Sequence, residues 1–168
     1  MRTSTSRAEA LACAAADVSS RMPEDIGKTL AVDHGGKRIG LAVCDEFGLI
    51  AMPLRVVEVG RNRDAVFAEI AAAAVAENAV RLVVGLPLNM DGTEGPQAQE
   101  ARRFGDELGR RTALPVEYVD ERLTSYAAEH ALRAAELTRG KKKARLDAVA
   151  AAMILNAWLE ARRPPPGS

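Results

Sequence analysis

Aromatic residues, cysteines, net charge and long apolar runs are all scarce in this chain of 168 residues. Aromatics make up only 4% of it, so the core is expected to consist mainly of Val, Leu, Ile and Ala. The two cysteines, Cys13 and Cys44, lie far apart and show neither a Cys-x-x-Cys nor a zinc-ligand spacing, which favours a reducing, cytoplasmic setting. No apolar run approaches about 18 residues, so no membrane span is expected.

The charges of the chain balance, with 23 Lys and Arg against 23 Asp and Glu. Without an overall basic excess, any nucleic-acid-binding surface must be a local cluster. The hydrophobic content of 48% and the charged content of 27% are typical of a globular protein. A chain of this length is long enough for one domain with a sizeable core but hardly for two.

We expect a single domain over residues 28–162, between a disordered extension over residues 1–27 and a disordered tail over residues 163–168. The extension is rich in Ser, Thr and Ala and lacks the apolar centre of a secretory signal. An alternative is that translation begins at Met22.

Hydrophobic periodicity and turn residues predict five strands and four helices in the order βββαβαβαα. The Gly35-Gly36 pair favours a tight hairpin between the first two strands, and Pro53 favours a sheet edge for the third. This order implies an α/β fold with a mixed five-stranded sheet covered by helices. The strands are expected at residues 29–33, 38–44, 50–59, 79–86 and 115–120, and the helices near residues 61–78, 96–112, 124–137 and 142–162.

Acidic residues stand where apolar strands end. Asp33 ends the first predicted strand (LAVDHGG), and Asp120 and Glu121 end the last (VEYVDER). Burying an unpaired carboxylate is costly, but neighbouring strands lie about 4.8 Å apart, so two strand-end carboxylates can share one cation. Asp147 borders the apolar stripe of the last predicted helix, from which it can face the same strand ends.

A site made only of carboxylate oxygens suits Mg²⁺ or Mn²⁺ better than zinc. Such a cluster is what two-metal phosphodiester hydrolysis requires, with the ions about 3.5–4 Å apart. Each acid also has a structural alternative. Asp33 can serve the turn before Gly-Gly, Asp120 or Glu121 can cap a helix or pair with Arg122, and Asp147 can pair with Lys143.

Basic residues gather immediately before Asp147. The segment RGKKKAR contains no acid. Such a run is usually only a solvated loop, but this one begins the predicted helix that carries Asp147, which adds weight to phosphate binding. The hairpin after Asp33 can add two more cations. The candidate nucleic-acid-binding residues are Lys37, Arg38, Arg139, Lys141, Lys142, Lys143 and Arg145.

Four ordered segments resemble the YqgF family, also called RuvX-like. They are DHGGKRIGLAV, VVGLPLNMDGTEGP, VDERLTSYAAE and LDAVAAAMIL, and the resemblance covers about residues 28–160. The family is assigned as pre-16S rRNA nucleases and was earlier described as Holliday junction resolvases. The resemblance implies a ribonuclease H-like fold, with Asp33, one acid of the Asp120-Glu121 pair and Asp147 at its acidic positions.

Strand alternation places Asp120 and Glu121 on opposite faces, so one of them is expected to point into the site, and comparison with related resolvases favours Glu121. The family usually has Asp-x-Gly-Thr-Lys-Arg where this chain has Gly36 in place of the Thr. This departure is expected only to relax the turn.

The leading hypothesis is a metal-dependent nuclease that processes the 5′ end of precursor 16S rRNA during ribosome biogenesis. A second hypothesis keeps the chemistry but takes branched DNA as the substrate, which would require two coordinated sites and hence a homodimer. A third is a non-catalytic, nucleic-acid-binding assembly factor in which the acids are structural. Aromatics for base stacking are scarce, which favours recognition of backbone or shape over reading of bases.

Overall fold

The computed structural model describes residues 27–124 and 140–163, and for residues 140–145 it describes the backbone alone. Five strands form one sheet in the order β3-β2-β1-β4-β5, in which β1 is antiparallel to β2 and parallel to β4. The strands are β1 (Thr29–His34), β2 (Arg38–Cys44), β3 (Ala51–Glu58), β4 (Arg81–Leu86) and β5 (Val116–Asp120). The helices are α2 (Arg63–Ala76), α3 (Pro96–Thr112), the short 3₁₀ helix η1 (Glu121–Leu123) and α5 (Gly140–Glu160).

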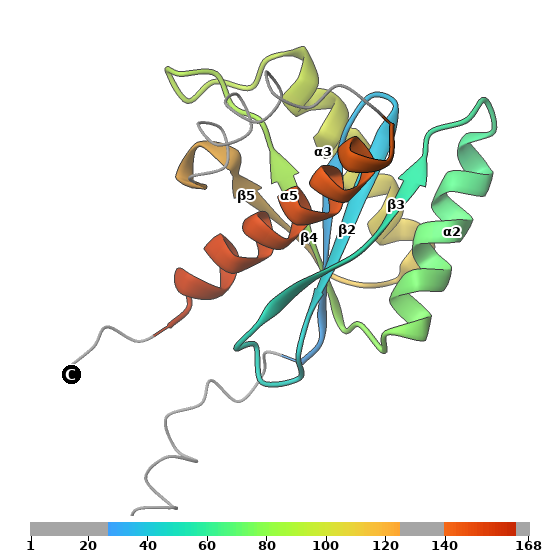
Figure 1. The fold of residues 1–168 in the computed structure, drawn as a ribbon. Coiled ribbons are helices and arrows are strands. Elements are labelled where there is room, and N and C mark those ends of the chain that lie inside the picture. Colours follow the sequence, from blue (N-terminus) through green and yellow to red (C-terminus); the bar gives the residue numbers. More distant parts are fainter. Residues whose placement is uncertain (1–26, 125–139, 164–168) are drawn as a thin grey trace, which may run out of the picture.

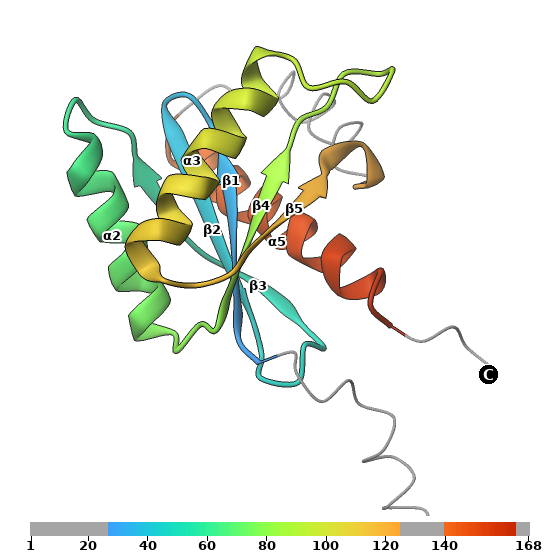
Figure 2. The same ribbon diagram turned by 180° about the vertical axis from the view of Figure 1, so that it is seen from behind.

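Helices cover both faces of this mixed sheet, which confirms the fold class expected from the sequence. Helix α5 crosses one face (Figure 1), and α2 and α3 lie on the other (Figure 2). The edge position of β3, the strand that contains Pro53, is also as predicted. The predicted helix over residues 124–137 lies almost wholly outside the described residues. None of the described helices combines the length and the apolar character needed to cross a membrane.

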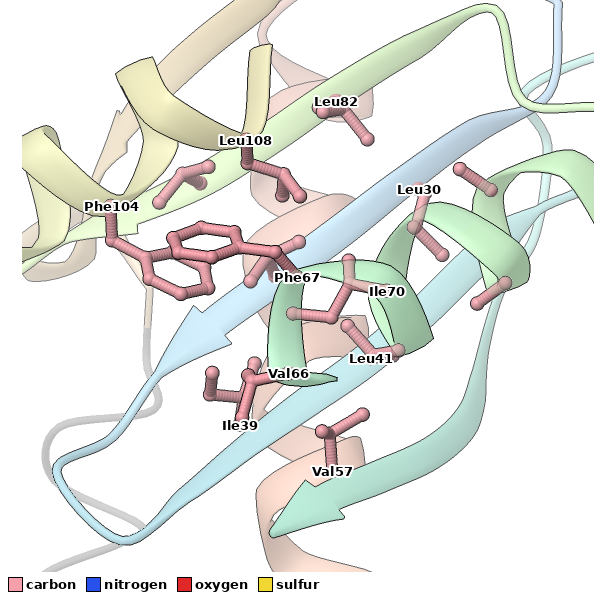
Figure 3. Packing of buried hydrophobic residues seen from close by; sticks show 14 of the residues in the cluster. Leu30, Ile39, Leu41, Val57, Val66, Phe67, Ile70, Leu82, Phe104 and Leu108 are labelled. Carbon is pink, nitrogen blue, oxygen red and sulfur yellow. The ribbon is translucent and has the colours of Figure 1, made fainter. Parts of the chain in front are cut away.

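The two faces of the sheet differ in the size of their side chains. Large residues of β1 and β2 pack with Phe67 and Phe104 from α2 and α3 (Figure 3). Alternate residues on the opposite face are small, among them Ala31 and Ala42, and pack against α5. Because Asp33 follows Ala31 by two positions, it shares the face that α5 covers, whereas His34 turns toward α2 and α3.

At Gly40 the main chain of α5 lies directly against the sheet. It pairs directly with Asp33 across the β1–β2 ladder. A Cβ atom at this position would lie 1.9 Å from the main-chain oxygen of Asp147, well inside van der Waals contact. The absence of a side chain at Gly40 therefore sets the distance between Asp147 and the end of β1.

We expect Gly40→Ala to lower the free energy of unfolding by more than about 3 kcal/mol, because the new methyl group must push α5 away from β2. Chemical denaturation followed by circular dichroism measures this loss. The matched control is Gly36→Ala, since nothing lies within 4 Å of a Cβ at Gly36. Equal stability of these two variants would contradict the close packing of α5.

Candidate active site

Asp33 lies at the carboxyl end of β1, the central strand of the sheet. The run of buried residues before it, from Leu30 to Val32, fixes the strand and therefore the direction of the carboxylate. The following Gly35 closes the hairpin, with its N–H donating to the main-chain oxygen of Arg38 at 3.0 Å. The hairpin forms as predicted, so the turn and the acid position coexist at this point of the chain.

Glu121 reaches the same region from β5, two strands away. The pairing of Leu86 with Asp120 brings the end of β5 level with the end of β4, and Glu121 follows as the first residue of η1. Its side chain lies over Gly85, where a Cβ would meet Oε1 of Glu121 and Cδ1 of Ile154, each at 2.6 Å. The glycine in β4 therefore provides the space in which this carboxylate sits.

Asp147 comes from α5, more than a hundred residues after Asp33. The Nε of Arg38 donates to its Oδ2 at 2.8 Å, and both side chains are mostly buried. An ion pair of this kind fixes the rotamer of the carboxylate. The sequence also allowed a pairing of Asp147 with Lys143, whose side chain lies outside the described part of the structure.

The three carboxylates line one cavity of about 410 Å³ at the carboxyl ends of the central strands. Asp33 forms its floor from the sheet, Glu121 contributes from η1, and Asp147 contributes from α5. The rest of its lining comes from the hairpin, from the loop after β4 and from the first turns of α3. These residues are His34, Gly35, Gly36, Pro87, Gln97 and Glu100.

The electrostatics of this cavity favour the uncharged forms of Asp33 and Glu121. Burial, reinforced by the charges of Glu121 and Asp147, raises the pKa of Asp33 from 3.8 to about 7. Burial and the charge of Asp120 also raise the pKa of Glu121. Within the described residues neither Asp33 nor Glu121 forms an ion pair, so a cation bound in the cavity would supply the counter-charge that their ionised forms lack.

Asp120 takes a different role from its neighbour. Its carboxylate accepts from the main-chain N–H of Arg122 and from the Arg122 guanidinium, which lowers the pKa of Asp120. The same guanidinium donates to the main-chain oxygens of Asn89 and Met90 in the loop after β4. Asp120 and Arg122 therefore tie this loop to η1, and the structure does not bring Asp120 into the cavity.

The candidate phosphate-binding residues are described only in part. Lys37 is exposed at the hairpin tip, whereas Arg38 is engaged by Asp147. Arg139 and the side chains of Lys141, Lys142, Lys143 and Arg145 lie outside the described residues, although the backbone of residues 141–145 belongs to the first turns of α5. A nucleic-acid-binding role for these residues stays a prediction.

The donor chemistry of the cavity fits a hard divalent cation. All three donors are carboxylates, and two of them have raised pKa values and lack a described cationic partner. In the part of the chain that the structure describes, no three His, Cys, Asp or Glu side chains are gathered closely enough to hold a metal ion. The acids thus share one cavity without forming a finished coordination shell.

The chain matches the model of a known protein family over most of its length. The family model described as RuvX, Holliday junction resolvase, matches residues 27–161. The chain belongs to the RuvX family. This membership confirms the resemblance found in the four sequence segments.

Curated relatives of the RuvX family carry the name "Putative pre-16S rRNA nuclease", as three examples show. One from Anaeromyxobacter dehalogenans is 48% identical over 137 residues, which cover 82% of this chain and 99% of the relative. One from Kineococcus radiotolerans is 46% identical over 138 residues, covering 82% and 73% of the two chains. One from Myxococcus xanthus is 41% identical over 138 residues, covering 82% and 91%.

Among solved structures, the RuvX fold is similar to that of T. thermophilus RuvC in complex with a Holliday junction substrate. The TM-score is 0.50 at 17% sequence identity, over 81% of this chain and 95% of RuvC. At this identity the likeness shows the fold alone. It agrees with the mixed sheet and its two helical layers.

Proposed function

We propose that this protein is a divalent-metal-dependent nuclease that hydrolyses phosphodiester bonds and processes the 5′ end of precursor 16S rRNA in the cytoplasm. The observation that supports it best is the single cavity in which Asp33, Glu121 and Asp147 meet at the strand ends. The names of the curated RuvX relatives support the choice of substrate. The raised pKa values of Asp33 and Glu121 support an acid site suited to a cation.

Asp33, Glu121 and Asp147 are the residues that would hold Mg²⁺ or Mn²⁺, as one ion or two. Bound there, such ions supply a hydroxide from water and stabilise the leaving oxygen of a phosphodiester. Metal binding would require the ionised forms of Asp33 and Glu121, so their raised pKa values would make binding dependent on pH. Arg38 orients Asp147, and the glycines at 40 and 85 let α5 and Glu121 lie close to the sheet.

The test is a cleavage assay with a precursor 16S rRNA 5′ fragment and a synthetic four-way DNA junction side by side, in Mg²⁺, in Mn²⁺ and in a chelator. We expect metal-dependent cleavage of the RNA and a loss of at least roughly two orders of magnitude in Asp33→Asn and Asp147→Asn, because each removes a charge from the site. The matched control is Asp45→Asn, in the turn between β2 and β3, where the side-chain oxygen only accepts main-chain N–H groups.

If both Asp33→Asn and Asp147→Asn still cleave the RNA, these carboxylates take no part in catalysis. Selective cutting of the four-way junction would move the substrate to branched DNA, the activity named in the RuvX family description, and would call for a test of dimerisation. Tight RNA binding by folded wild-type protein without cleavage in either metal would favour a non-catalytic assembly factor.

A further inference from the structure

A second cavity, of about 300 Å³, adjoins the acid cavity. The two share His34, Gly36 and Glu100 in their linings. Because successive residues of a strand point to opposite faces, Asp33 and His34 look into different layers of the molecule. The second cavity therefore lies around the end of β1 from the acids, on the side of α2 and α3.

The floor of this second cavity is aromatic and apolar. The rings of His34 and Phe104 lie 4.6 Å apart between centroids, and those of Phe104 and Phe67 lie 4.7 Å apart and nearly parallel. Figure 3 shows the two phenylalanine rings stacked between α2 and α3. Both phenylalanines are almost fully buried, whereas His34 is half-buried and forms the outer member of the stack. His34, backed by the two buried rings, is therefore the member of the stack that a flat aromatic group can reach.

The rim of the cavity is basic. Arg61 and Arg63 line it at the start of α2, and both are exposed. Within the described residues neither guanidinium forms an ion pair, in contrast to Arg111, which is held by Asp64 and Glu107. Glu100 is the only acid in the lining of this cavity as described, so the cations outnumber it two to one.

We propose that this second cavity is a nucleotide subsite, which takes one unpaired nucleotide of the substrate next to the phosphodiester that is cut. The base would lie against His34 and the apolar floor, and the neighbouring phosphate would bind Arg61 and Arg63. A cavity near 300 Å³ with apolar walls and a few polar groups matches small-molecule sites in general. Stacking on aromatic side chains together with a basic rim is how single strands are held.

This assignment rests on the proposed nuclease function and adds a condition to it. A base that is stacked and paired in a duplex cannot enter the subsite, so the strand must be unpaired or opened beside the cut. An isolated phosphate ion would bind the two arginines but would leave the apolar floor of the cavity without a contact. The continuity of the two cavities through His34 and Gly36 makes one strand passing through both the simplest occupant.

The first arm of the test measures binding of a short fluorescent single-stranded RNA by anisotropy, in a chelator so that no cleavage occurs. We expect Arg61→Gln/Arg63→Gln to bind about tenfold more weakly, with the slope of log K against log salt reduced by about 0.7, as for one lost phosphate contact on a single strand. The charge-matched control is Arg110→Gln/Arg163→Gln, two exposed arginines outside both cavities, which should bind like the wild type.

The second arm compares that RNA with a chain of the same length made of abasic ribose phosphates. The wild type should bind the RNA more tightly, and Gly36→Leu should lose the difference, because the new side chain projects into the open space at Gly36. Gly36→Ala is its control. Equal binding of the abasic chain by the wild type, or equal binding by the two arginine double variants, overturns the subsite.

The failure of the subsite and the failure of the nuclease function are separable. Binding in a chelator requires no catalysis, so a protein that never cuts but shows both binding differences keeps the nucleotide subsite and loses the nuclease function. A protein that cuts RNA with metal but shows neither difference keeps the nuclease function and loses the subsite.

Discussion

Asp33→Asn is expected to raise the melting temperature of the metal-free protein by roughly 10 °C at pH 8, although Asp33 belongs to the candidate active site. The cause is the pKa of Asp33, which burial and the charges of Glu121 and Asp147 raise from 3.8 to about 7. The native state therefore holds this proton more tightly than the unfolded chain. The stability that it confers is fully present below about pH 4 and is lost as the pH rises through 7.

The size of the effect follows from the shift. A change of about three pKa units corresponds to about 4 kcal/mol between the protonated and ionised forms, which is an upper figure for one buried group. Asparagine has nearly the same shape as aspartate and carries no charge, so Asp33→Asn avoids this penalty above pH 7. Below pH 4 the wild-type carboxyl is protonated in both states, and the two proteins should unfold at similar temperatures.

Thermal unfolding followed by circular dichroism from pH 4 to pH 8, in a chelator, measures this prediction. Asp120→Asn is the control with the opposite sign, because the bonds from Arg122 lower the pKa of Asp120. The stability that Asp120 confers is present above its unfolded pKa and is lost as the pH falls, so Asp120→Asn should be slightly less stable than the wild type at pH 8. A melting temperature for Asp33→Asn that matches the wild type across the whole range would contradict the buried, uncompensated carboxylate.

Glu121→Gln should reduce metal-dependent cleavage by at least roughly two orders of magnitude, whereas Asp120→Asn should retain most of it. The two acids are adjacent in sequence but only Glu121 lines the cavity. Asp120 caps η1 and holds Arg122, and asparagine keeps the acceptor oxygen of that cap. The pair of variants therefore separates a group that acts on the substrate from one that supports the loop after β4.

Single-turnover cleavage of the RNA fragment under saturating metal gives the rates for this comparison. Glu121→Gln should also bind the RNA in a chelator at least as well as the wild type, since a negative charge has been removed near the backbone of the strand. The reverse order of activities, with Asp120→Asn inactive and Glu121→Gln active, would assign the site to the other acid of the pair.

The sheet and its layers are predictable from the sequence because local signals agree there. The apolar run that contains Val83 and Val84 predicts a strand buried on both faces, and Pro53 predicts the edge strand. The start of α3 follows from Pro96 in its first turn. The meeting of Asp33 and Glu121 follows from the rule that acids at strand ends meet at one edge of the sheet, and Asp147 joins them from the border of the apolar stripe of α5.

Contacts between distant segments are beyond the reach of such signals. The partner of Asp147 is Arg38, 109 residues earlier, and a single sequence offers no reason to prefer it over a nearby lysine. The hydrogen bonds from the Arg122 guanidinium to the main-chain oxygens of Asn89 and Met90 also join segments that are far apart in the sequence. Only the folded sheet brings these segments together. No sequence motif predicts the cavity that His34, Arg61 and Arg63 line. Taken alone, these residues are typical of a hairpin and of the start of a helix.

The acid cavity draws on both ends of the domain. Asp33 comes from β1 and Asp147 from α5, the first strand and the last helix that the structure describes, so synthesis must reach α5 before the set of acids is complete. A nascent chain or a proteolytic fragment that ends before α5 has Asp33 and Glu121 but lacks the third carboxylate and the layer that buries them. The topology therefore leaves the acid cavity incomplete in any copy of the chain that lacks α5.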